Sequence, residues 1–85
     1  MTIYLDEDAV FSEMDALQDE ESYYWLRSNA PRHARIVEKL IERGVSPEQV
    51  RRRFLSRSRG EQSAFAARIE QAARHYQATR QREAQ

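Results

Sequence analysis

The sequence contains no cysteine, only two glycines and two prolines, and no apolar run of membrane length. Without cysteine, a disulfide framework and a thiolate metal site are both excluded. The scarcity of Gly and Pro, together with abundant Ala, Arg, Glu and Gln, favours helices. The first residues also lack the basic and apolar regions of a signal peptide. We therefore expect a cytoplasmic protein that does not enter a membrane.

Charge is distributed unevenly along the chain. Residues 1–26 hold eight carboxylates and no Lys or Arg, whereas residues 27–85 hold all fourteen basic residues and six acids. The chain is neutral overall, but it consists of an acidic block of net −8 and a basic block of net +8. This asymmetry is typical of proteins that bind a charged partner. Thirteen of the fourteen basic residues are Arg, which favours fork-like pairing with carboxylate or phosphate groups.

The chain length and the spacing of apolar residues predict a single all-α domain. Eighty-five residues suffice for one small core and are too few for two domains. We predict a bundle of three to four helices after a short extended N-terminal segment. An acidic helix should occupy about residues 7–28 and a basic helical part about residues 31–80, with a frayed tail over residues 81–85.

Several short signals set the predicted helix boundaries. Asn29 is placed to cap a helix that starts at Pro31. Gly44 is placed to end that helix in the left-handed conformation. Ser46 and Gln49 then form a capping box for the next helix. Apolar residues make a stripe on the first helix and a seam on the last, and these are Val10, Phe11, Met14 and Leu17, followed by Phe65, Ile69, Ala72 and Tyr76.

The segment Leu40–Phe54 resembles the core of a helix-turn-helix DNA-binding motif. The similarity lies in the Gly-Val-Ser turn at Gly44 and in the apolar Val50 that follows. Family members typically carry a small residue in place of Leu40 and an apolar residue in place of Arg43. The resemblance implies that the second helix exposes side chains that reach phosphates or base edges. An ordinary helical corner is the alternative interpretation.

Arginine-rich helices form the leading candidate site, a nucleic-acid-binding or partner-binding surface. Five arginines fall within nine residues from Arg51 to Arg59, and a second basic stripe lies on the preceding helix. Such a surface binds phosphates through counterion release and needs no sequence specificity. Gln49 is the one candidate base reader. The predicted binding residues are Arg32, Arg35, Lys39, Arg43, Gln49, Arg51, Arg52, Arg53, Arg57 and Arg59.

A protein partner is the alternative hypothesis. The acidic block could imitate a phosphate backbone, as in a small phage or mobile-element inhibitor or adaptor, or the Arg patch could bind an acidic protein. In a homodimer, the acidic helix of one copy could cover the basic helices of the other. Aromatic and Arg residues anchor many interfaces. The candidate interface residues are Asp15, Asp19, Glu20, Tyr23, Tyr24 and Trp25.

The sequence offers no catalytic or metal-binding constellation. Ser and Tyr occur without a convincing base or oxyanion arrangement. His33 and His75 are far apart and have no acid at metal-ligand spacing, so we expect each to be a half-buried, packed histidine. The acidic block lacks the continuation of a calcium loop. We therefore expect a binding protein that is not an enzyme and uses no cofactor.

Overall fold

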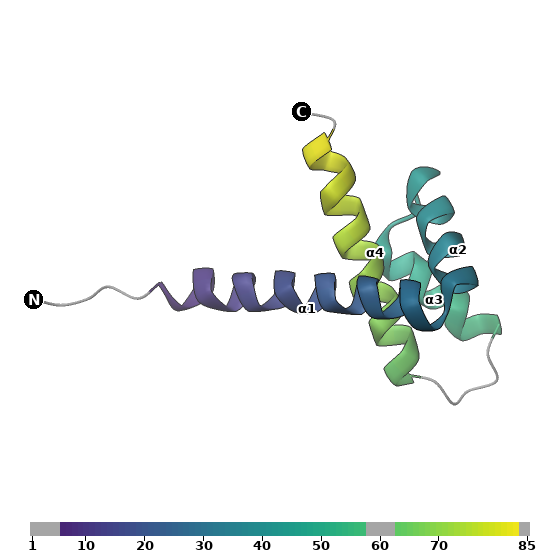
Figure 1. The fold of residues 1–85 in the computed structure, drawn as a ribbon, viewed down its shortest axis with the longest axis horizontal. Coiled ribbons are helices and arrows are strands. Elements are labelled where there is room, and N and C mark those ends of the chain that lie inside the picture. Colours follow the sequence, from purple (N-terminus) through teal and green to yellow (C-terminus); the bar gives the residue numbers. More distant parts are fainter. Residues whose placement is uncertain (1–5, 58–62, 84–85) are drawn as a thin grey trace, which may run out of the picture.

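The computed structural model describes residues 6–57 and 63–83, and it contains four helices and no strand within these ranges (Figure 1). The helices are α1 (Glu7–Asn29), α2 (Pro31–Glu42), α3 (Pro47–Arg57) and α4 (Ser63–Glu83). The all-α prediction is confirmed, and the acidic segment forms one continuous helix. The predicted extended segment before residue 6 lies outside the described residues.

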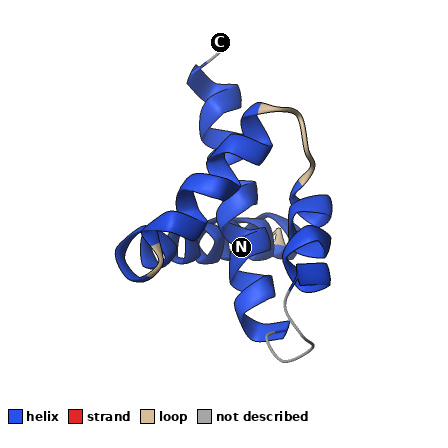
Figure 2. Ribbon diagram, turned by 90° about the vertical axis from the view of Figure 1, so that its right-hand side faces the viewer, coloured by secondary structure: helices blue, strands red, loops and turns tan. Residues whose placement is uncertain are grey.

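The core lies where the second half of α1 packs across α4, with α2 and α3 covering the same region (Figure 2). Leu26, Val37, Val50 and Ile69 are its largest fully buried side chains, and each comes from a different helix. Ala72 and Ala73 are completely buried on α4, where their small side chains allow α1 and α2 to approach closely. The predicted seam of α4 therefore faces the core.

The predicted signals at the α2–α3 corner are confirmed. Gly44 has a φ of +89°, the left-handed conformation that other residues avoid. The Gln49 backbone amide donates to Ser46 Oγ at 3.3 Å, and the Ser46 amide donates to Gln49 Oε1 at 3.4 Å. This reciprocal pair is the capping box that satisfies two otherwise unpaired donors at the start of α3.

Two boundary predictions were wrong. Asn29 is the last residue of α1, where its side-chain amide donates to the Trp25 carbonyl at 2.9 Å, and Ala30 occupies the N-cap position of α2. Asn29 belongs to α1 and not to α2, because α1 continues through Tyr23 and Trp25 into the core. At the other terminus, α4 is helical to Glu83, three residues beyond the predicted end of the basic helical part. Residues 84–85 of the predicted tail lie outside the described residues.

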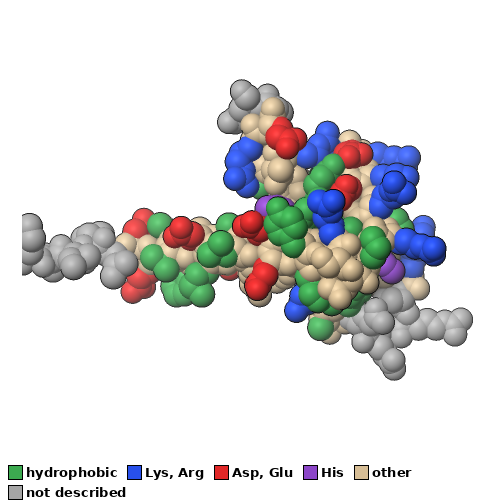
Figure 3. All heavy atoms as spheres, viewed as in Figure 1, with side chains coloured by type: hydrophobic (Ala, Val, Ile, Leu, Met, Phe, Trp, Pro, Cys, Tyr) green, Lys and Arg blue, Asp and Glu red, His purple; other side chains and the backbone are tan. Residues whose placement is uncertain are grey.

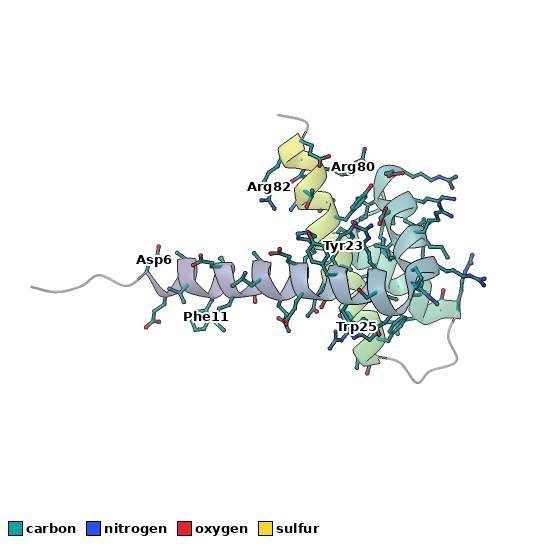
Figure 4. All side chains as sticks on the ribbon, viewed as in Figure 1. Asp6, Phe11, Tyr23, Trp25, Arg80 and Arg82 are labelled. Carbon is teal, nitrogen blue, oxygen red and sulfur yellow. The ribbon has the colours of Figure 1, made fainter. Side chains whose placement is uncertain are left out.

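The first half of α1 projects from the body of the protein (Figure 1). We call Glu7–Gln18 the arm, because every residue in this range is exposed. Its apolar stripe lies away from the other described helices: Val10, Phe11, Met14 and Leu17 have relative exposures between 40 and 61%. Figure 4 shows Phe11 projecting from the arm, far from the other helices. The amphipathic pattern of this segment thus predicted a helix correctly, but its apolar side chains are not part of the core.

Contacts with α4 begin where the arm ends. Arg74 donates through Nε and Nη2 to the two carboxylate oxygens of Asp19, at 3.2 and 3.3 Å. One turn later, Ser22 Oγ donates to Gln71 Oε1 at 2.5 Å. These contacts and the buried Leu26 fix the direction of α1 relative to the body. The arm therefore continues a helix whose other half is anchored in the core.

Candidate nucleic-acid interface

Most of the predicted basic residues lie on the outer sides of α2 and α3, at the end of the molecule opposite the arm (Figure 3). Seven of these residues are exposed, and none of the seven forms an ion pair or side-chain hydrogen bond with another described residue. We call this set the basic face, and it consists of Arg32, Arg35, Lys39, Arg43, Arg52, Arg53 and Arg57.

Tyrosine hydroxyls hold the two carboxylates of α2 on the side of that helix that faces α1 and α4. Tyr23 Oη donates to Glu38 Oε1 at 3.1 Å, and Tyr76 Oη donates to Glu42 Oε1 at 2.6 Å. The two tyrosine rings stack with their centroids 6.0 Å apart. Because both carboxylates are engaged there, neither forms an ion pair with the basic residues of α2.

These hydrogen bonds also affect how the tyrosines titrate. The hydrogen bond to Glu42, assisted by partial burial, raises the pKa of Tyr76 from 10.0 to about 12. Burial raises the pKa of Tyr23 above 10.0, and the neighbouring Glu38 carboxylate adds to this increase. Both tyrosines therefore stay neutral and act as hydrogen-bond donors throughout the physiological pH range.

Three predicted binding residues do not belong to the basic face. Arg51 is half-buried and its Nη1 donates to Glu70 Oε2 at 3.1 Å, so its charge is already paired. Gln49 is exposed, but its carbonyl oxygen accepts from the Ser46 amide in the capping box, so part of its hydrogen-bonding capacity is already used. Arg59 lies outside the described residues.

An apolar groove runs between α2 and α3 and is closed at its base by the start of α4. It has a volume of about 360 Å³. Arg53 and Arg57 line its α3 side. On the α2 side, Ile36 has a relative exposure of 47%. The lining residues are His33, Ile36, Leu40, Arg53, Phe54, Arg57, Phe65 and Ala66.

Sequence reasoning missed this groove because it depends on how far apart α2 and α3 lie. The apolar residues of α2 span a broad arc. Ala34, Val37 and Ile41 are buried in the core, and Leu40 packs against it. The remaining apolar edge of the arc, Ile36 and Leu40, faces the groove. The signal available in the sequence was the width of this apolar arc, which is greater than packing against the core alone requires.

The two histidines differ in their surroundings. His33 is exposed, contrary to prediction, and its ring contacts those of Phe54 and Phe65 at the groove. His75 is half-buried, as predicted, and packs against Tyr23 and Tyr24. The described residues contain no group of three or more His, Cys, Asp or Glu side chains that could hold a metal ion.

The aromatic cluster and the acidic candidates lie on α1, away from the basic face. Tyr23 is buried, Trp25 is half-buried with the Arg68 guanidinium 4.4 Å from its ring centroid, and Tyr24 is exposed. The cluster is therefore part of the core and leaves one aromatic ring on the surface. Asp15 lies on the arm and Glu20 is exposed just beyond it, while Asp19 pairs with Arg74.

No helix within the described ranges has the length and apolar character needed to cross a membrane. No protein-family model, curated protein or solved structure matches this chain.

Proposed function

We propose that the protein is a small, non-catalytic nucleic-acid-binding module that uses the basic face of α2 and α3. The observation that carries this proposal is the exposure of seven basic side chains, none with an acidic partner among the described residues. Unpaired guanidinium groups at this density favour a polyanion, since each phosphate contact releases condensed counterions. The use of Arg further favours bidentate contacts with phosphate oxygens.

The geometry of the α2–α3 corner supports the same proposal. Gly44 in its left-handed conformation and the Ser46–Gln49 capping box form the kind of short turn found in helix-turn-helix motifs. After this turn, α3 exposes Arg52 and Arg53. In that motif the second helix enters the major groove and contacts base edges and phosphates. The side-chain NH₂ group of Gln49 remains available to read a base.

The proposal is tested by fluorescence anisotropy with a labelled DNA duplex and a labelled single strand over a range of salt concentrations. Each phosphate contact should contribute about −0.9 to the slope of log K against log salt on duplex DNA. The variant Arg35→Gln/Arg52→Gln should therefore flatten the slope by about two. Both side chains are exposed, so the fold should not change.

A matched control removes the same charge elsewhere. Arg80 and Arg82 lie on the last turn of α4, outside the basic face (Figure 4). The variant Arg80→Gln/Arg82→Gln should therefore retain a slope close to that of wild type. Equal flattening in both variants would indicate attraction by overall charge alone. Absence of binding to any nucleic acid at low salt by folded protein would contradict the proposal.

A second candidate function is a protein-binding adaptor, and the exposed stripe of the arm favours it. Four large exposed apolar side chains on an acidic helix are typical of a helix that docks in an apolar groove of a partner. Pull-down from a lysate with and without nuclease separates the two functions. Material captured only without nuclease treatment would indicate nucleic acid, whereas capture of proteins that survives nuclease and is lost in Leu17→Asp would indicate an adaptor.

A further inference from the structure

We infer that the arm of one copy docks in the α2–α3 groove of a second copy, so that two copies form a reciprocal pair. This inference does not depend on the proposed nucleic-acid binding. It concerns two features that the chain leaves unsatisfied: the apolar stripe of the arm and the apolar groove between α2 and α3. Each feature has the chemical character and the length that the other requires.

The chain cannot satisfy these features within one molecule. The groove lies between α2 and α3, and these helices are at the end of the body opposite the arm (Figure 1). α1 is one uninterrupted helix, and its second half is held by the buried Leu26 and by the Asp19–Arg74 pair. To reach its own groove, the arm would have to break this helix. We therefore assign the groove to the arm of another copy.

The charges of arm and groove are complementary. At 100° per residue, Asp8 and Asp15 flank one edge of the apolar stripe and Glu13 flanks the other. Glu7 falls within the stripe, at the N-terminal end of the arm. The arm contains four carboxylates and no basic residue. In the groove, Arg53 and Arg57 line the α3 side, and Arg32 lies one turn from Ile36 on the α2 side. An apolar helix with acidic edges thus meets an apolar groove with basic edges.

The same charges argue against direct pairing of two arms. Packing two apolar stripes together would place four carboxylates of each arm beside four of the other. These like charges repel at short range, and no basic residue of the arm offsets them. Docking in the groove buries the same apolar side chains and also pairs the neighbouring carboxylates with the basic residues at the edges of the groove.

The length of the apolar stripe also agrees with that of the groove. The stripe runs from Val10 to Leu17, and the α2 side of the groove runs from His33 to Leu40. At about 1.5 Å per residue, each extends roughly 10 Å. The groove volume of about 360 Å³ suits apolar side chains from one face of the arm rather than the whole helix. Each copy offers one arm and one groove, so a two-fold pair satisfies both contacts.

Sedimentation equilibrium of the full chain tests the inference. Wild type should pass from 10.1 kDa to twice that mass as concentration rises. Leu17→Asp in the arm and Ile36→Glu in the groove should each weaken association about tenfold or more, because each places a charge in an apolar contact. Both residues are exposed in the single chain, so circular dichroism should show unchanged helicity.

Ala16→Asp is the matched control, because it adds the same charge on the opposite side of the arm and should associate like wild type. Mixing Leu17→Asp with Ile36→Glu should restore a mixed pair, since the first supplies an intact groove and the second an intact arm. Only contact between unlike surfaces predicts such complementation.

Three results would overturn the inference. Wild type that remains monomeric at every concentration would leave the groove to a different partner. Association that is lost in Leu17→Asp but unaffected in Ile36→Glu, without complementation, would indicate pairing of the arms. A mass that grows without limit would indicate an open chain of copies instead of a closed pair.

Discussion

Tyr76 on α4 donates a hydrogen bond of 2.6 Å to Glu42 near the end of α2. This contact joins two helices at the surface and places a carboxylate beside a tyrosine ring that also stacks on Tyr23. Tyr23 on α1 holds Glu38 in the same way. Tyrosine hydroxyls from the neighbouring helices thus hold both carboxylates of α2 along one edge of its basic residues.

The first prediction concerns the titration of Tyr76. Its pKa is raised from 10.0 to about 12, mainly by the Glu42 carboxylate that accepts a hydrogen bond from its hydroxyl. Glu42→Gln should lower this pKa towards 10.0, because the amide carries no charge. Tyrosinate absorbance of each protein, measured with and without Tyr76→Phe, isolates the titration of this ring. An identical pKa in wild type and Glu42→Gln would contradict the assignment.

The sign of the associated stability change follows from linkage. The folded protein holds the Tyr76 proton more tightly than the unfolded chain, whose pKa is 10.0. The hydrogen bond therefore contributes its full stability below pH 10 and loses it as the pH rises towards 12. Wild type should lose more stability over this window than Glu42→Gln, as judged by urea unfolding at each pH.

The second prediction concerns the α2–α3 corner. Ser46→Ala should lower the free energy of unfolding by about 1 kcal/mol, since it removes the cap hydrogen bond to the Gln49 amide. Gly44→Ala should lower it by roughly 1 to 2 kcal/mol through backbone strain. A Cβ at Gly44 would contact nothing within 4 Å, so this loss is conformational and not steric.

Ser56→Ala is the control for the cap. Ser56 lies inside α3, where its hydroxyl donates to the Arg53 carbonyl and competes with the helical hydrogen bonds. Its replacement by Ala should leave stability unchanged or slightly increased. Thermal melts in which Ser46→Ala and Ser56→Ala behave alike would show that the capping box does not stabilise α3.

The third prediction concerns the arm. Deleting residues 1–14 should change the stability of the monomer little, because the deleted part of the arm is exposed and Asp15 can cap the shortened helix. Leu26→Ala, by contrast, should cost about 2 to 5 kcal/mol, since Leu26 is completely buried. Urea unfolding at concentrations below self-association checks both. A large loss on deletion would mean that the arm supports the fold.

Local signals in the sequence predicted the helices well. The Gly44 stop, the Ser46 capping box and the α4 seam each depend on residues close together in the chain, and the structure confirms all three. Asn29 was misread because two signals competed: it precedes Pro31, as a cap would, but it also continues the α1 pattern. The longer helix prevailed because its second half enters the core.

The site was less predictable because it depends on how the helices are arranged. A stripe such as Val10, Met14 and Leu17 shows that a helix is amphipathic, but it does not show whether the covering surface belongs to the same molecule. Exposed arginines could be identified from periodicity, whereas the pairing of Arg51 with Glu70 could not, since it joins α3 to α4. The groove likewise arises only from tertiary packing.

The last prediction combines the two proposals. Arg53 and Arg57 belong both to the basic face and to the groove, so nucleic acid and the arm of a second copy should compete for them. Competition is reciprocal by linkage: a DNA duplex should dissociate the pair, and association should weaken binding to the duplex. At protein concentrations where wild type is paired, Leu17→Asp should therefore bind a duplex more tightly than wild type does.

Ala16→Asp makes this comparison specific. It carries the same added negative charge, which by itself should weaken binding to DNA slightly. It keeps the apolar stripe intact, so it should remain paired and bind the duplex no more tightly than wild type. Anisotropy and sedimentation of the same samples report both equilibria. If the pair persists in saturating duplex, and if Leu17→Asp and Ala16→Asp bind equally, then arm and nucleic acid use separate surfaces.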